Sequence, residues 1–336
     1  MTAATFPALT ALGLAGSLGA GLVHHAYASV RHLADHPGFE RHERRCGSGN
    51  LVSYHVRRGR PGGGTVVCEA GLMNTSSAWL LVADHVDAGT TVVLVDRAGY
   101  RRSLRRCPER YCFQESVGDL AEVVAEASDP AGTTVLAGHS MGGYLAHRTA
   151  AGMPGRVHGV VLVDPTHPRE LHHSMAQRSG SRGMDLTLRL GPGSAVLGCG
   201  LLLDKRNLFA YAADNPHRRA LRLEVSASST WRAARREWAY AYAFMVDGGR
   251  ELQQLDVPVV VAAAESTLQG TPEHRDLYDE YVASGSGGHV RTVPGSDHLS
   301  ILGAAAPAAA TAAEITALLD RASRARRPLT PVGGRS

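Results

Sequence analysis

The chain has 336 residues, of which 44% are hydrophobic and 20% are charged. This ordinary globular composition excludes a disordered chain, a collagen-like chain and a polytopic membrane protein. The 35 Lys and Arg residues exceed the 31 Asp and Glu residues by only four, so the charge gives little ground for a nucleic-acid partner, and none is expected.

Residues 1–30 contain no Asp, Glu, Lys or Arg. The apolar stretch 7–30 is as long as a membrane-spanning helix, which needs about 20 residues, but its alanines, glycines, His24 and His25 make it only marginally apolar. Three interpretations are open: a signal anchor, which we favour, a cleaved signal peptide ending near the A-x-A sequence at 26–28, and an amphipathic helix of a cytoplasmic protein. Arginines follow the stretch and none precedes it, so an anchored chain would keep its main domain in the cytoplasm.

From residue 44 onward, short apolar runs alternate with helical stretches. Residues 51–56 alternate between polar and apolar and predict a half-buried strand. Valine-rich runs, typical of strands buried on both faces, cover residues 65–69, 91–96, 133–137, 160–163 and 257–263. Helices are expected at about 76–88, 113–128 and 141–152. This order predicts the α/β class, with a mostly parallel sheet covered by helices.

Between about residues 166 and 250 no valine-rich run occurs, and residues recur at helical spacing instead. We interpret this segment as a helical cap inserted between two strands. A last strand is expected at 289–293, followed by an alanine-rich helix at about 307–322. The predicted organisation is an apolar segment at 1–30, a main domain at 44–323 that includes the cap, and a disordered tail at 324–336.

The cysteines indicate little chemistry, because no CxxC pair is present and a zinc site has no support. Cys107 and Cys112 flank a short loop and could pair in an oxidising compartment. Two free thiols beside a surface loop are an equally good interpretation.

The motif that most strongly indicates chemistry is Gly-x-Ser-x-Gly, centred on Ser140. It lies where a valine-containing run ends and a helix is expected to begin. On such a turn the serine hydroxyl is exposed in a strained backbone conformation, and Gly138 and Gly142 omit side chains that would collide there. The motif therefore predicts that Ser140 is a nucleophile.

A serine hydroxyl is a poor nucleophile until a base removes its proton, so a histidine is expected after the last strand. His298 follows the predicted strand 289–293 and suits this role. His289 begins that strand and would lie at the wrong end of the sheet.

Two carboxylates compete to orient this histidine. Asp164 ends the run 160–163, and Glu265 ends the run that follows. Both would lie at the carboxyl edge of a parallel sheet, and both preserve the chain order serine, acid, histidine. We favour Asp164 and keep Glu265 as the alternative.

Attack by a serine on an acyl group also needs donors for the negative oxygen, each worth roughly 2.7–4 kcal/mol. One predicted donor is the backbone N–H of Met141, directly after the nucleophile. The second is expected in the loop after strand 65–69. We assign it to the N–H of Leu72, because Gly71 lets the chain turn this amide inward.

These features resemble the α/β-hydrolase superfamily over roughly residues 44–323. The segments that carry the resemblance are Glu69–Trp79, Asp96–Tyr100, Gly138–Gly142 and Gly295–His298. Val163–Pro168 also resembles a Val-Asp-x-x-His-Pro sequence in an esterase- and lipase-like branch of serine hydrolases that often carry an N-terminal membrane segment. The resemblance implies a triad of Ser140, Asp164 and His298 and favours a membrane anchor.

Some positions depart from the pattern of these relatives. Thr267 stands where many of them have an aspartate, which favours Asp164 as the acid. Met73, in the predicted oxyanion loop, and Arg101 stand where glycine is common. The five arginines between residues 101 and 110 could attract an anionic substrate, but we favour a solvated loop.

The sequence thus predicts a serine hydrolase that cleaves a carboxylic ester or a related small acyl compound through an acyl-enzyme, without a cofactor. The serine argues against haloalkane dehalogenase and epoxide hydrolase chemistry, which uses an aspartate on this fold. An amide or peptide hydrolase is one alternative, although the cap has few carboxylates to hold a free amine. A non-catalytic, hydrolase-like binding protein is the other alternative.

Overall fold

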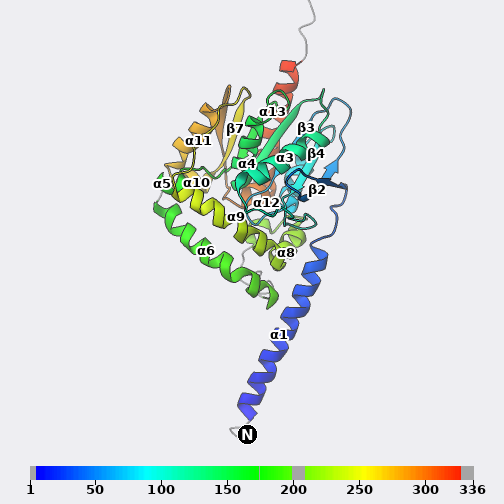
Figure 1. Cartoon of the computed structure of the whole chain (residues 1–336), viewed down its shortest axis with the longest axis vertical. Coiled ribbons are helices and arrows are strands. Elements are labelled where there is room, and N and C mark those ends of the chain that lie inside the picture. Colours follow the sequence, from blue (N-terminus) through cyan, green and yellow to red (C-terminus); the bar gives the residue numbers. More distant parts are fainter. Residues whose placement is uncertain (1–4, 174, 199–208, 327–336) are drawn as a thin grey trace, which may run out of the picture.

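A single eight-stranded sheet lies at the centre of the computed structural model, which describes residues 5–173, 175–198 and 209–326 (Figure 1). The strand order is β1-β2-β4-β3-β5-β6-β7-β8. β2 pairs antiparallel with β1 and β4, and all other neighbours are parallel, which confirms the predicted fold class. The strands are β1 (Glu40–Arg45), β2 (Leu51–Arg57), β3 (Thr65–Glu69), β4 (Thr91–Asp96), β5 (Thr134–His139), β6 (Val160–Val163), β7 (Val259–Ala264) and β8 (Gly288–Val293).

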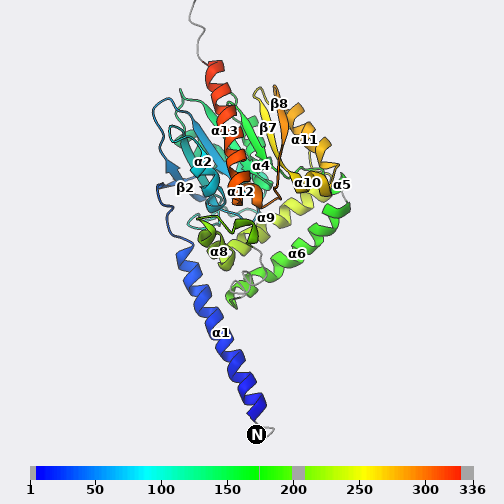
Figure 2. The same cartoon turned by 180° about the vertical axis from the view of Figure 1, so that it is seen from behind.

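Helices cover both faces of this sheet. One face packs against α3 (Phe113–Ala127), α4 (Met141–Ala151) and α11 (His274–Ala283). The other face packs against α2 (Leu80–His85), α12 (Ser300–Gly303) and α13 (Ala305–Arg326), which are seen from behind in Figure 2. Apart from the helices between β6 and β7, the remaining short helices are η1 (Ser76–Trp79) and α10 (Glu265–Gly270).

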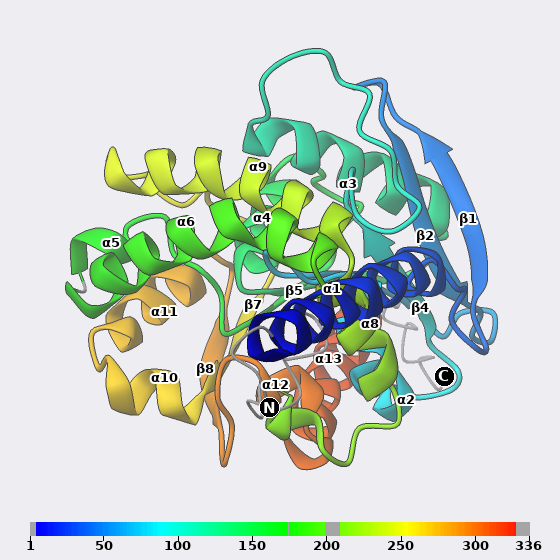
Figure 3. The same cartoon turned by 90° about the horizontal axis from the view of Figure 1, so that it is seen from below.

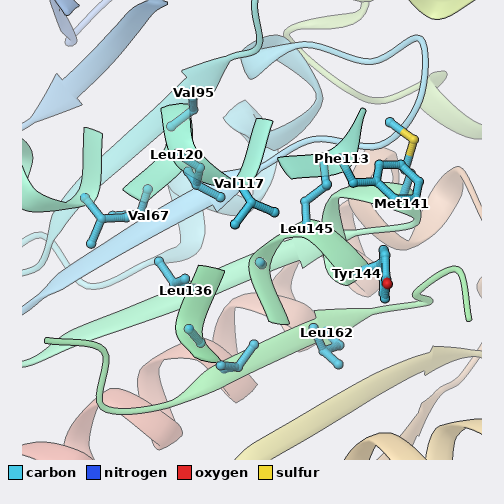
Figure 4. Close-up of a cluster of buried hydrophobic side chains, with 14 of the residues drawn as sticks. Val67, Val95, Phe113, Val117, Leu120, Leu136, Met141, Tyr144, Leu145 and Leu162 are labelled. Atoms are coloured by element: carbon cyan, nitrogen blue, oxygen red, sulfur yellow. The ribbon is translucent and has the colours of Figure 1, made fainter. Parts of the chain in front are cut away.

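The core is double-sided because successive residues of a strand point to opposite faces. Val67 and Leu136 join the cluster under α3 and α4, shown in Figure 4, whereas their neighbours Val66 and Val135 join the cluster under α2 and α13. All four side chains are at most 1% exposed. Burying each such side chain contributes about 1.5–3 kcal/mol, which explains why these strands read as continuous apolar runs.

β1 was not anticipated from the sequence. Its six residues are Glu, Arg, His, Glu, Arg and Arg, so it has no apolar alternation to detect. It pairs with β2 alone, at one edge of the sheet. Charged side chains suit such an edge because they discourage pairing with another chain.

Between β6 and β7 the chain forms helices, and within the described part of this segment no strand occurs. Figure 3 views α6, α8 and α9 across the end of the sheet. Residues 199–208 of this segment lie outside the described residues. These helices, called the cap below, are α5 (Glu170–His173), α6 (Met175–Val196), η3 (Ala210–Ala212), α8 (Arg218–Ser226) and α9 (Ser228–Val246).

The N-terminal segment forms helix α1 (Thr5–Arg31), which extends away from the body in Figure 1. It contacts α6, α8 and α9. The sequence predicts a membrane anchor in this segment, but among the described helices none combines the length and the apolarity needed to cross a membrane.

Two further predictions concern the tail and the cysteines. Helix α13 continues to Arg326, three residues into the segment predicted as a disordered tail, and the rest of that segment lies outside the described residues. Cys107 and Cys112 are free thiols, which agrees with the second of the two interpretations of their spacing.

Candidate active site

Ser140 occupies the sharp turn between β5 and α4. Its backbone has φ 53° and ψ −127°, a conformation that is costly for a residue with a side chain. A Cβ on Gly138 would lie 2.4 Å from the carbonyl oxygen of Gly142, and one on Gly142 would lie 2.4 Å from that of Ala70. A side chain at 138 would therefore collide within the turn, and one at 142 would collide with the loop after β3.

His298 bridges the serine and a carboxylate. Its Nε2 lies 3.1 Å from Ser140 Oγ, and its Nδ1 lies 2.6 Å from Asp164 Oδ2. Because an ionised carboxylate only accepts hydrogen bonds, Nδ1 carries the proton, which leaves Nε2 to accept from the serine hydroxyl. The arrangement brings Ser140, His298 and Asp164 together in the order expected for proton transfer.

Asp164 is bound by more than the histidine. It follows β6 in a left-handed conformation (φ 42°), and the residue is 2% exposed. Its carboxylate accepts hydrogen bonds from the N–H of Ala264 (2.9 Å), the hydroxyl of Thr267 (2.8 Å) and the hydroxyl of Tyr278 (2.9 Å). Burial alone would raise its pKa, but the hydrogen bond and charge of His298, together with these donors, lower the pKa to about 2. Asp164 is therefore ionised at neutral pH.

The His298 side chain lies in the loop between β8 and α12 and is 47% exposed. Desolvation opposes its protonation, but the hydrogen bond and charge of Asp164 outweigh that effect and raise the pKa of His298. His139 holds this loop in place, because its Nε2 lies 2.8 Å from the His298 carbonyl oxygen. Burial lowers the pKa of His139 to about 3, so this ring is neutral and donates that hydrogen bond.

The alternative acid, Glu265, does not reach the histidine in this arrangement. It is the first residue of α10, and its carboxylate accepts a hydrogen bond from the N–H of Gly295 at 2.9 Å. Its own N–H is donated to Ser296 Oγ at 3.2 Å. Glu265 thus holds the start of the loop that carries His298.

Sequence reasoning missed the side chains that support Asp164. Thr267 was noted only as the absence of an aspartate, yet its hydroxyl binds the acid. Tyr278 lies on α11, 114 residues from Asp164, and no local pattern marks such a partner. The hydroxyl of Thr166 also lies 3.5 Å from Ser140 Oγ.

The two predicted oxyanion donors, Leu72 and Met141, flank the nucleophile. Both residues line the same cavity as Ser140, and a Cβ on Gly71 would lie 3.0 Å from Ser140 Cβ. Within the described residues, neither the Leu72 N–H nor the Met141 N–H is donated to a protein acceptor. Met73 has φ 65°, the left-handed conformation that explains why glycine is common at this position.

Arg101 corrects the interpretation of the arginine-rich loop. It too has a positive φ (46°), but its side chain is buried and not solvated. It lies 3.1 Å from Asp96 and 3.1 Å from Glu224 of α8. These paired charges attach the loop to the cap, so Arg101 is not available to attract an anionic substrate.

A cavity of about 680 Å³ opens beside Ser140 and His298. Its walls are mainly apolar and aromatic, and about half of the residues that line it come from the cap, including Met184, Phe209, Trp231, Trp238 and Phe244. Glu170 also lines it, and burial raises the pKa of this carboxyl to about 7. No group of three His, Cys, Asp or Glu side chains among the described residues is arranged to hold a metal ion.

The model of the Alpha/beta hydrolase family matches residues 61–314, three quarters of the chain. The chain belongs to the alpha/beta hydrolase family. The chain is 30% identical over 116 residues to Lipase LipV of Mycobacterium tuberculosis, a match that covers 34% of this chain and 42% of the lipase. The chain therefore spans less than half the length of that curated relative.

Solved structures agree on the fold. The Cif epoxide hydrolase of Acinetobacter nosocomialis aligns with a TM-score of 0.66 and 13% identity, covering 88% of this chain and 96% of that chain. ALR0039 of Nostoc aligns with a TM-score of 0.65 and 20% identity, covering 84% and 98% of the two chains. At such low identity these likenesses establish the architecture alone.

Proposed function

We propose that this protein is a hydrolase that cleaves carboxylic esters through a covalent acyl-serine. The observation that carries the proposal is the chain of hydrogen bonds from Ser140 through His298 to Asp164, beside a cavity large enough for a small acyl compound. Ser140 is activated in the manner of a serine–histidine–aspartate triad, because the base and its orienting acid are already in contact.

In the proposed reaction Ser140 Oγ attacks the acyl carbon while His298 Nε2 accepts the hydroxyl proton. Asp164 stabilises the imidazolium that forms, and the N–H groups of Leu72 and Met141 bind the negative oxygen. The tetrahedral species collapses as His298 returns the proton to the departing alcohol. Water then attacks the acyl-serine with His298 again as base, which releases the acid and restores the serine.

The lining of the cavity favours an uncharged, largely apolar substrate. Aromatic and sulfur-containing side chains of the cap surround the space in which an acyl or alcohol group would lie. The similarity to a lipase supports an ester, although it covers only part of each chain. Ser140 at the nucleophile position argues against the epoxide hydrolase chemistry named for some of the structural neighbours.

A second candidate is hydrolysis of an amide with a nearby free amine. Glu170 favours it, because this carboxylate lines the cavity and could bind an ammonium group. However, its pKa of about 7 leaves much of it protonated near neutral pH, which weakens an ion pair with an amine. The ester therefore suits the cavity better.

The test is covalent labelling of the full chain with a fluorophosphonate, followed by turnover of matched p-nitrophenyl esters and p-nitroanilides. Labelling and ester turnover are expected for the wild type and for Ser266→Ala, which removes an exposed serine of α10. Both should be lost in Ser140→Ala, and His298→Ala should lower both by orders of magnitude. An unlabelled wild type would indicate a binding protein, and faster anilide than ester turnover would favour the amide candidate.

A further inference from the structure

A buried charged cluster joins the loop after β3 to the cap helix α9. Arg97, directly after β4, forms a two-point contact with Glu237 of α9, at 2.9 Å (Nε to Oε1) and 3.0 Å (Nη2 to Oε2). Its Nη1 also lies 2.5 Å from Glu69 Oε1, at the end of β3. All three residues are at most 6% exposed, so their charges have little solvent to replace a lost partner.

The same groups hold the residues on either side of Leu72. Arg97 donates to the carbonyl oxygen of Gly71 at 2.9 Å and to that of Ala70. The hydroxyl of Tyr100 accepts the N–H of Met73 at 3.2 Å and donates to Glu237 at 2.7 Å. The loop that presents the Leu72 amide is therefore fixed before and after that residue by two side chains, and both of them bind Glu237.

Glu237 belongs to the cap, not to the sheet. The next residue of α9, Trp238, lines the cavity, as do Ala241 and Phe244 one and two turns further on. A substrate that fills the cavity contacts the helix from which Glu237 reaches the loop. The Glu237 carboxylate therefore links the position of cap helix α9 to the position of the Leu72 N–H.

We propose that Glu237 is a positioning residue through which α9 holds the oxyanion loop 70–73 in its active arrangement. The inference rests on the proposed function, since it assumes that the Leu72 amide binds a negative oxygen. With glutamine at position 237, Arg97 keeps only Glu69 as a charged partner. The single amide oxygen of glutamine then replaces two carboxylate oxygens that accept three hydrogen bonds from Arg97 and Tyr100. Both side chains can then shift, and the 70–73 backbone loses the contacts that fix its amide.

A matched control lies elsewhere in the cap. Glu224 of α8 is also buried, at 3% exposure, and it also pairs with an arginine, Arg101, at 3.1 Å. It binds Ser77 of η1 as well, but no contact joins its side chain to residues 70–73 in the described structure. Glu224→Gln therefore removes a buried cap carboxylate while leaving the oxyanion loop and its partners in place.

The experiment compares Glu237→Gln with Glu224→Gln in the full chain. It measures kcat and KM on a p-nitrophenyl ester and the inhibition constant of a trifluoromethyl ketone, whose serine adduct carries a negative oxygen. For Glu237→Gln we expect kcat to fall about 10- to 100-fold, less than the loss of a whole oxyanion donor. The inhibition constant should rise in proportion, while KM changes by less than about threefold. For Glu224→Gln all three values should stay within about threefold of the wild type.

Two further measurements keep the result decisive. The melting temperatures of both glutamine variants measure how much stability is lost when a buried carboxylate is removed. If Glu237→Gln does not fold, Tyr100→Phe tests the same connection between Glu237 and the oxyanion loop while retaining Glu237. Equal losses of kcat in the two glutamine variants, or an unchanged ketone affinity in Glu237→Gln, would overturn the inference. A wild type that fluorophosphonate does not label would instead overturn the proposed function.

Discussion

The ends of β6 and β7 are neighbours in the sheet, and each is followed by one acidic residue, but the two carboxylates have different surroundings. Asp164, after β6, is 2% exposed and receives hydrogen bonds from a histidine, a threonine, a tyrosine and a backbone amide. Glu265, after β7, is only partly buried and, within the described part of the chain, receives one, from the N–H of Gly295.

The difference arises in the backbone beyond each strand. Asp164 turns through a left-handed conformation and is surrounded by α10 and α11. Glu265 instead begins α10, so the helix directs its side chain toward the loop before His298. A carboxylate at the edge of a parallel sheet thus orients a histidine only when other elements supply donors that keep it ionised while it is buried.

The largest expected effect separates these two carboxylates directly. Asp164→Asn should lower kcat on a p-nitrophenyl ester by about 10⁴-fold, because an amide favours the wrong tautomer of His298 and does not stabilise its cation. Glu265→Gln should change kcat by less than about threefold. If the glutamine variant lost activity and the asparagine variant did not, the assignment of the acid would be reversed.

A second effect tests the donors around Asp164. Tyr278→Phe removes a hydrogen bond to a charged acceptor and should lower the free energy of unfolding by about 1.5–3 kcal/mol. Tyr281→Phe is the control on the same helix, because its hydroxyl donates to the uncharged carbonyl oxygen of Thr166 at 2.7 Å. It should cost only about 0.5–1.5 kcal/mol. Urea denaturation at pH 7 measures both, and equal costs would show that the charge of Asp164 adds nothing.

A third effect is a loss of folding stability at acidic pH. The pKa of Asp164 is about 2 in the folded chain and 3.8 for an ordinary aspartate, so the unfolded chain binds its proton first as the pH falls. This carboxylate should contribute about 2 kcal/mol of stability above pH 4, which is lost as the pH falls from 4 to 2. Urea denaturation across that range should show a smaller loss for Asp164→Asn than for the wild type. A loss of the same size in both would contradict the depressed pKa.

The smallest expected effect concerns the pH dependence of activity. His298 must be neutral to accept a proton, so kcat/KM should rise with pH through the raised pKa of this histidine. The nearby carboxylate of Glu170 helps to raise that pKa. Glu170→Gln should therefore move the acidic limb of the kcat/KM–pH profile to lower pH, and Glu265→Gln should leave that limb in place. A limb that moves to higher pH in Glu170→Gln would rule out this electrostatic contribution.

Local patterns predicted those parts of the molecule that depend on neighbouring residues. The elbow at Ser140 is one, since its turn requires glycines two positions before and two positions after the serine. The buried strands are another, and residues 65–69, 91–96 and 160–163 coincide with β3, β4 and β6. β1 was missed because an edge strand needs no apolar pattern, and Arg101 was misjudged because its partners Asp96 and Glu224 come from separate elements.

The sequence by itself determined the fold class and the chemical types available at the edge of the sheet: a serine on a strained turn, a late histidine and two competing acids. The sequence favoured Asp164 over Glu265, and the tertiary structure adds the donors from α10 and α11 that surround Asp164. Only the tertiary structure joined Glu237 of the cap, through Arg97, to the loop after β3. The physical reason is the sequence separation over which each effect acts. Periodicity and turn chemistry act over a few residues, whereas burial and pairing of a charge depend on groups more than 100 residues away in the chain.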